Sequence, residues 1–314
     1  MKTLEYLLLV SRRTIRRGSA GDGMAGDVKL FSSRKKQHLG NGTEFADHRV
    51  YVPGDDLRHL DWNLFARLEE RFIKRFEVDE DINIYFLLDC SRSMQAGTGN
   101  QNKYNYARRL VASLAYIALH DLNRVGVVCF ADGICETFAP VRGNGKFLNL
   151  LKFLEQTEPS GNVTDIRLSV DEFIRRTKRV GVAVIVSDFF DRGGFQFAVD
   201  KLRYNKFEPL IIQLHTDFES DPQLEPALRS LMRTNFTLIS IENESVTDNN
   251  EINVTINESI LNQYKECFAD FLCSIRKYCI GRGVDYMIAG TSVPFDELVL
   301  QMIRNGTITK TKYS

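Results

Sequence analysis

Three oxygen-bearing side chains, Asp89, Ser91 and Ser93, occupy alternating positions directly after the apolar run 82–88. The run has the composition of a buried strand, so these side chains stand in the turn where the strand ends. One carboxylate and two hydroxyls at this spacing can converge on a hard cation, Mg²⁺ or, as alternatives, Mn²⁺ or Ca²⁺. Three such ligands leave the cation under-coordinated and under-neutralised. A site of this kind tends to recruit an acidic residue of a partner as a further ligand.

Two more oxygen donors follow at matching places in the chain. Thr164 lies in a loop before a predicted helix, and Asp188 follows the apolar strand 180–186. An open parallel sheet binds ligands at the carboxyl ends of its strands, so these loops should meet the Asp89 turn at one edge. The alternative is that the serines only cap helices, as serines after a strand often do.

From residue 81 onward the apolar pattern alternates between strands and helices. Apolar runs predict strands at 82–88, 125–130, 134–138, 180–186, 209–214 and 285–289. Helical spacing predicts helices at 104–122, 147–154, 166–177, 195–202, 258–280 and 294–303. This alternation predicts an α/β fold with a doubly wound, mostly parallel, Rossmann-like sheet.

We expect three parts along the chain. Residues 1–80 should form a helix, a Gly-rich loop and a Pro-Gly-Asp-Asp segment packed on the core, with an alternating strand at 71–77. Residues 81–220 should form the main domain. Residues 221–314 should add a hairpin, a long helix, a strand and a last helix that complete the sheet.

Composition argues against several classes of protein. Lys plus Arg and Asp plus Glu both number 41 among 314 residues, so no overall field draws the chain to nucleic acid or to a membrane. The longest apolar runs are strand-sized, well below the ~18 residues of a transmembrane helix. Cys267, Cys273 and Cys279 cannot share one helix face, which argues against a metal cluster or a disulfide ladder there. We therefore expect a cytoplasmic protein with reduced cysteines.

The Asp-x-Ser-x-Ser turn, the later Thr164 and the later Asp188 together resemble the metal-ion-dependent adhesion site of von Willebrand factor A domains. A second resemblance covers most of the chain. The segment Tyr51–Asn63 (YVPGDDLRHLDWN), then Ala66 and Arg67, then the Asp-x-Ser-x-Ser strand are similar to the bacterial "domain of unknown function 58" family. Those proteins are von Willebrand A-like and typically accompany MoxR-type AAA+ ATPases.

The resemblance implies a role for each donor. Ser91 and Ser93 would ligate the cation directly, and Asp89 and Asp188 would ligate it directly or through water. Thr164 would change its coordination as affinity changes. The resemblance also implies a sheet of von Willebrand A type and a MoxR-type AAA+ ATPase as partner. On this reading the protein is a non-enzymatic, metal-dependent adaptor that captures an acidic residue of a protein client.

A dense charged segment precedes the main domain, and two readings of it stay open. It could dock a partner, or it could be an ion-pair and turn network that clamps the segment on the sheet with the only tryptophan as a plug. We favour the clamp. Its residues are Gly54, Asp55, Asp56, Arg58, Asp61, Trp62 and Arg67.

An enzyme is the main alternative function, because Mg²⁺ on a Rossmann-like sheet also serves phosphoryl transfer and hydrolysis. Haloacid-dehalogenase phosphatases need Asp-x-Asp after the first strand, and Ser91 replaces the second carboxylate here. The segment Gly143–Phe147 lacks the spacing and the hydroxyl of a phosphate-binding loop. The five histidines show no orienting partners for nucleophilic catalysis. A nucleic-acid module is also disfavoured, because no platform of aromatic and basic residues is visible.

Overall fold

The computed structural model describes residues 38–40, 44–78, 82–97, 99–161, 164–191, 193–222, 235–238, 252–255 and 258–304. The helix and Gly-rich loop expected within residues 1–30 lie outside these ranges. None of the helices in the described ranges is both long and apolar enough to cross a membrane.

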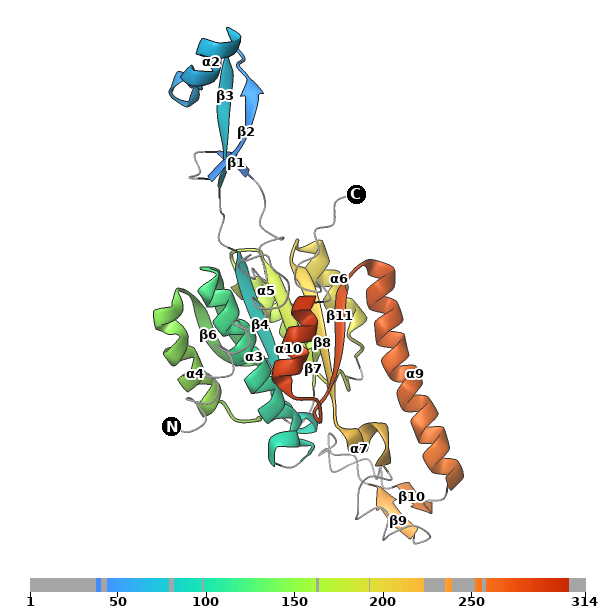
Figure 1. Ribbon diagram of the computed structural model, residues 1–314. Coiled ribbons are helices and arrows are strands. Elements are labelled where there is room, and N and C mark those ends of the chain that lie inside the picture. The colour runs from blue at the N-terminus through green and yellow to red at the C-terminus, as the bar shows by residue number, and fades with distance from the viewer. Residues whose placement is uncertain are drawn as a thin grey trace.

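A six-stranded sheet forms the centre of the molecule (Figure 1). Its strands are β4 (Asn83–Asp89), β5 (Arg124–Phe130), β6 (Ile134–Arg142), β7 (Val182–Ser187), β8 (Glu208–His215) and β11 (Asp285–Gly290). They lie in the order β11-β8-β7-β4-β5-β6. All neighbours pair in parallel except β6, which runs antiparallel to β5 at one edge. The predicted α/β fold with a doubly wound, mostly parallel sheet is confirmed.

Helices cover both faces of this sheet, which explains why its inner strands are continuous apolar runs. The helices on one face are α3 (Lys103–His120), α4 (Phe147–Gln156) and α10 (Phe295–Arg304). Those on the other face are α5 (Ile166–Arg176), α6 (Gln196–Tyr204) and α9 (Glu258–Arg282). Each face has its own hydrophobic cluster, so the sheet is held rigidly from both sides.

The remaining elements lie outside the central sheet. A separate three-stranded sheet, β1 (His38–Gly40), β3 (Phe72–Val78) and β2 (Glu44–Val50), carries the short helix α2 (Trp62–Leu68). Figure 1 shows this N-terminal unit beyond the end of the six-stranded sheet. A hairpin of β9 (Asn235–Leu238) and β10 (Ile252–Thr255) lies in the part of the chain, residues 221–314, where the sequence predicted one. Helix α7 (Asp217–Ser220) follows β8, and the 3₁₀ turns are η2 (Leu57–His59), η3 (Arg92–Gln95), η4 (Gly99–Gln101) and η5 (Asn144–Lys146).

Candidate metal centre

Asp89 is the last residue of β4 and is completely buried. Its Oδ1 accepts a hydrogen bond of 2.9 Å from the backbone N–H of Ser91, and its Oδ2 accepts one from the hydroxyl of Ser187 at the end of β7. Two neighbouring strands therefore fix the carboxylate at the carboxyl edge of the sheet. This is where the sequence predicted it.

Ser91 and Ser93 follow in the tight turn that contains η3. Their hydroxyl oxygens lie 3.0 Å apart, within hydrogen-bond distance of each other. Ser91 occupies the N-cap position of η3, yet its side chain makes no capping hydrogen bond. The helix-cap reading of this serine is therefore wrong. The two hydroxyls instead form a close pair of oxygen donors beside Asp89.

Thr164 lies at this edge and carries a buried hydroxyl. The residue is only 2% exposed, and its Oγ1 is buried without any hydrogen-bond partner in the part of the chain that the structure describes. A buried hydroxyl left unsatisfied costs about 1–3 kcal/mol and is rare in native proteins. An oxygen of this kind fits a metal ligand, because a cation would supply its missing partner.

Asp188 follows β7 and is also buried. Its Oδ1 accepts a hydrogen bond of 3.1 Å from the backbone N–H of Phe190. Its Oδ2 lies 2.6 Å from the Nζ of Lys103, whose side chain is fully buried. The next residue, Phe189, has a φ of 63°, a left-handed conformation that is strained for an aromatic residue. Local strain of this kind is often retained where a functional side chain must be aimed.

Lys103 carries a second ion pair that the sequence analysis missed. Its Nζ lies 2.5 Å from Oε1 of Glu219 in α7, and 5.2 Å from the centre of the Phe190 ring. Glu219 is itself held by a capping box, because its Oε2 accepts a 2.7 Å hydrogen bond from the backbone N–H of Thr216. The buried ammonium thus joins α3, the Asp188 loop and α7.

One signal for Lys103 was present in the sequence. Lys103, Ala107, Leu110 and Leu114 follow helical spacing, so the lysine belongs to the buried stripe of α3. A lysine on an apolar stripe needs an acidic partner. No sequence pattern identifies Glu219 as one of its partners, since 116 positions separate the two residues.

Backbone contacts join the loops of this edge. The N–H of Ser160 donates to the carbonyl of Cys90 over 2.8 Å, next to Asp89. The N–H of Asp165 donates to the carbonyl of Ala131 over 2.8 Å, beyond the end of β5. The N–H of Ile166 donates to the Asp191 carboxylate over 3.1 Å. The loops that carry Asp89, Thr164 and Asp188 are therefore fastened to one another at one edge.

Charge at this edge favours a cation. Burial, together with the charge of Asp188, raises the pKa of Asp89 above its ordinary value. Burial alone would lower the pKa of Lys103, but Asp188 and Glu219 raise it, so the lysine is charged at neutral pH. The carboxylates of Asp89, Asp188 and Glu219, when ionised, carry three negative charges, and the ammonium of Lys103 carries one positive charge. The remaining two negative charges match one divalent cation. Within the described residues no three His, Cys, Asp or Glu side chains form a metal-binding group, so the hydroxyl oxygens would have to contribute.

The charged segment of residues 54–67 belongs to the N-terminal unit. Asp61 is buried and caps α2 through the N–H groups of Asn63 and Leu64, and its Oδ2 lies 2.9 Å from Nε2 of His48. The hydrogen bond from His48 is the largest cause that lowers the pKa of Asp61, to about 2. These contacts hold the turn and helix of the unit together.

Other members of the segment are at the surface. Arg58 forms an exposed ion pair with Asp56, and Asp55 forms one with Arg49. Trp62 is 62% exposed, so its interpretation as a buried plug is wrong. The indole meets the Phe65 ring edge to face, and most of the residue's surface is exposed to solvent. Whether the segment docks a partner therefore stays a prediction.

The strand order, the helices on both faces and the Asp-x-Ser-x-Ser turn at the carboxyl edge define an α/β domain of the von Willebrand factor A type. Residues 47–219 match the family described as "Protein of unknown function DUF58". The match covers more than half of the chain, which therefore belongs to that family.

Curated relatives are uncharacterized proteins of Mycobacterium tuberculosis and Mycobacterium bovis, 30% identical over 154 residues. The match covers 48% of this chain and 48% of each relative, so the chain spans about half the length of the curated relatives it matches. Among solved structures, BatB from Bacteroides thetaiotaomicron is 17% identical and matches 73% of this chain and 100% of its own, with a TM-score of 0.43. A von Willebrand factor type A protein from Catenulispora acidiphila is 8% identical and matches 74% and 43%, with a TM-score of 0.37.

Proposed function

We propose that this protein is a non-enzymatic, metal-dependent protein-interaction module. Mg²⁺, or Mn²⁺ or Ca²⁺ in its place, would be held by the hydroxyls of Ser91, Ser93 and Thr164 and by the carboxylates of Asp89 and Asp188, directly or through water. The buried, unpartnered Oγ1 of Thr164 is the single observation that carries the proposal. It is difficult to explain by folding alone, because removing the hydroxyl would relieve a desolvation penalty.

Oxygen donors of this kind suit a hard cation that retains some water. When bound, the cation would supply positive charge and an open coordination position at the surface of the sheet edge. An acidic side chain of a client can fill that position, because carboxylate oxygen is a preferred ligand of such ions. The protein's own part would be to orient its five donors, and the backbone contacts between the loops support this role.

Lys103 would affect how strongly the cation binds an acidic side chain of the client. Its ammonium already neutralises part of the charge of Asp188 and Glu219. With a divalent cation present, the four ionised groups and the metal would sum to zero. An acidic ligand would then enter without a large repulsion from the site's own carboxylates. The ion pair between Lys103 and Glu219 also connects the site to α7, which follows β8.

We further propose that the module works with a MoxR-type AAA+ ATPase as an adaptor that presents the acidic client. Support comes from membership of the family together with the resemblance of residues 51–67 to its signature. The exposed side chains of Leu57, Trp62 and Leu68 in the N-terminal unit offer apolar contact area for a partner. This surface and the metal edge would then serve different partners.

An affinity pull-down from native cells, run in parallel with Mg²⁺ and with EDTA and read by mass spectrometry, tests the proposal. We expect an acidic client that is retained only with Mg²⁺, and an AAA+ ATPase among the proteins retained. The Thr164→Val variant is run in the same pull-down as a control, because it removes the unpartnered hydroxyl and keeps the shape of the side chain. A set of bound proteins that is unchanged by EDTA and by the variant would contradict the metal mechanism.

Substitutions at the metal centre differ in how much they would destabilise the fold. Asp188→Ala would leave the buried ammonium of Lys103 with Glu219 alone and would destabilise the protein, which confuses loss of binding with loss of folding. Ser93→Ala and Thr164→Val avoid this problem. If both variants retain the client in EDTA, phosphatase and hydrolase assays with Mg²⁺ become the next step, since an enzyme is the alternative function.

A further inference from the structure

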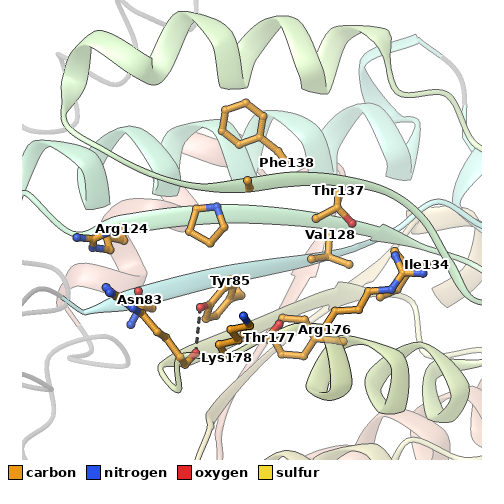
Figure 2. Close-up of a pocket in the computed structure, with 14 residues that line it drawn as sticks. Asn83, Tyr85, Arg124, Val128, Ile134, Thr137, Phe138, Arg176, Thr177 and Lys178 are labelled. Carbon is orange, nitrogen blue, oxygen red and sulfur yellow. Dashed lines mark hydrogen bonds between the residues drawn. The ribbon is translucent and has the colours of Figure 1, made fainter.

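A concave feature lies at the opposite end of β4 from Asp89. It is a cavity of about 420 Å³ beside the first residues of β4 and β5, between the edge strand β6 and the last turn of α5 (Figure 2). Asn83, at the start of β4, lines it, whereas Asp89 ends the same strand. The cavity is therefore separate from the candidate metal centre.

The cavity exists because helices do not cover the whole sheet near this edge. α5 ends at Arg176, and β6 bulges where Ala139 and Pro140 together oppose the single residue Gly126 of β5. A Cβ at Gly126 would lie 3.1 Å from Cγ of Pro140, so the glycine permits the bulge. Bulges of this kind often occur beside binding sites, where they redirect the strand.

Aromatic and aliphatic side chains form the floor of the cavity. The rings of Tyr85 and Phe173 meet edge to face with centres 5.2 Å apart, and Val128 lies beside them. The hydroxyl of Tyr85 donates a 2.9 Å hydrogen bond to the carbonyl of Arg179, which fixes the loop after α5 against the sheet (Figure 2). The floor is thus rigid and suits a flat or branched apolar group.

The rim is cationic. Arg124, Arg176, Lys178 and Arg179 line it. Arg176 is engaged by Glu172, but in the described ranges no carboxylate lies within ion-pair distance of Lys178 or Arg179. Basic residues are common in the last turn of a helix because they complement its dipole, but Lys178 and Arg179 lie beyond the end of α5, where that effect has faded. Among the described residues, neither side chain has a carboxylate partner, so both can face an anion in the cavity.

One buried acceptor also lacks a partner here. Asn83 donates through its Nδ2 to the carbonyl of Val180 over 3.2 Å, while its Oδ1 is buried and receives no hydrogen bond within the described residues. A ligand with an N–H or O–H group could satisfy this oxygen.

We propose that this cavity binds a small molecule that has an aromatic or branched aliphatic body and one anionic group, carboxylate or phosphate. The body would lie on Tyr85 and Phe173, and the anion would face Lys178 and Arg179. The volume falls within the ~300–1,000 Å³ of typical small-molecule sites. A concave site of this size favours a small molecule over an extended macromolecule. The proposal does not depend on the proposed metal-dependent function.

Matched probes test the proposal on the full chain. 2-Naphthoate, 2-naphthyl phosphate and the neutral methyl 2-naphthoate, which has no N–H or O–H group, share one aromatic body and differ in charge. Their binding is measured by ligand-observed NMR and by isothermal titration. We expect at least one of the two anions to bind about tenfold more tightly than the neutral ester, because a charge-assisted contact is stronger than a neutral one. The better of the two anions identifies the preferred group.

Two variants locate the binding. Ala139→Trp fills the cavity from the exposed edge strand, and Lys178→Glu reverses one rim charge. Both should abolish the preference for the anion, while Lys152→Glu on the exposed surface of α4 should leave it intact. Thermal unfolding and the far-ultraviolet circular dichroism spectrum of each variant verify that the fold is retained. Equal affinity for the neutral ester, no binding of any probe, or binding that survives Ala139→Trp in a folded protein would overturn the proposal.

Discussion

The buried ammonium of Lys103 leads to the sharpest prediction. Lys103→Met keeps a long unbranched side chain in the same space but removes the positive charge. Asp188, whose side chain is 0% exposed, would lose the cation that lies 2.6 Å from its Oδ2. Glu219 would also lose its ion pair, but its side chain is 17% exposed and can turn toward water.

The magnitude follows from this difference in burial. Removing one partner of a buried ion pair costs about 3–5 kcal/mol, because the other charge stays uncompensated. Asp188 should account for most of this loss and Glu219 for little of it. We therefore expect Lys103→Met to lose about 3–5 kcal/mol of unfolding free energy, a large part of the ~5–15 kcal/mol of a typical domain.

Urea denaturation followed by circular dichroism in EDTA measures the loss. Lys201→Met is the matched control, since Lys201 pairs with Asp171 in a partly exposed position and its ion pair should contribute about 0–1 kcal/mol. Added Mg²⁺ should stabilise Lys103→Met more than the wild type, because the cation returns positive charge to Asp188. A loss below about 1 kcal/mol in EDTA would refute the reasoning, since the lysine would then not compensate a buried charge.

Three more predictions concern other parts of the molecule. The hydrogen bond from His48 keeps the pKa of Asp61 near 2, so the N-terminal unit should be stable above the ordinary carboxyl pKa and should unfold as the pH falls toward 2. Backbone amide NMR signals of residues 44–78 measure this unfolding, and Asp61→Asn should abolish the transition. Trp62→Ala should change the unfolding free energy by only about 0.5 kcal/mol in urea denaturation, because the side chain is mostly exposed. Gly161→Ala should cost about 1–3 kcal/mol and weaken Mn²⁺ binding in titrations, because the residue has a φ of +103° and its Cβ would lie 2.5 Å from that of Ala131.

Much of this architecture could be predicted from local patterns. Apolar runs located the strands of the central sheet, and the rule that ligands gather at the carboxyl ends of parallel strands predicted that Asp89, Thr164 and Asp188 lie at one edge. The antiparallel edge strand β6 continues to Arg142, beyond the predicted end at residue 138, because its bulge at Ala139 and Pro140 interrupts the alternation that the prediction relied on.

Other features could not be read from the sequence because they depend on tertiary contacts. The meeting of Lys103 with Glu219 requires the relative placement of α3 and α7, which no local pattern encodes. The exposure of Trp62 was missed because large aromatic residues are usually buried. The cavity near Asn83 arises from a helix that ends early beside a strand bulge, and neither element reveals it alone.

Binding of Mn²⁺ to the metal-free protein tests the central claim most directly. The sharp electron paramagnetic resonance spectrum of free Mn²⁺ disappears when the ion is bound, so a titration counts occupied sites. Wild-type protein should bind one equivalent, Mg²⁺ should compete for it, and Thr164→Val should bind more weakly without loss of folding stability. Absence of binding, or equal binding by wild type and Thr164→Val, would contradict a metal centre at Asp89, Ser91, Ser93, Thr164 and Asp188.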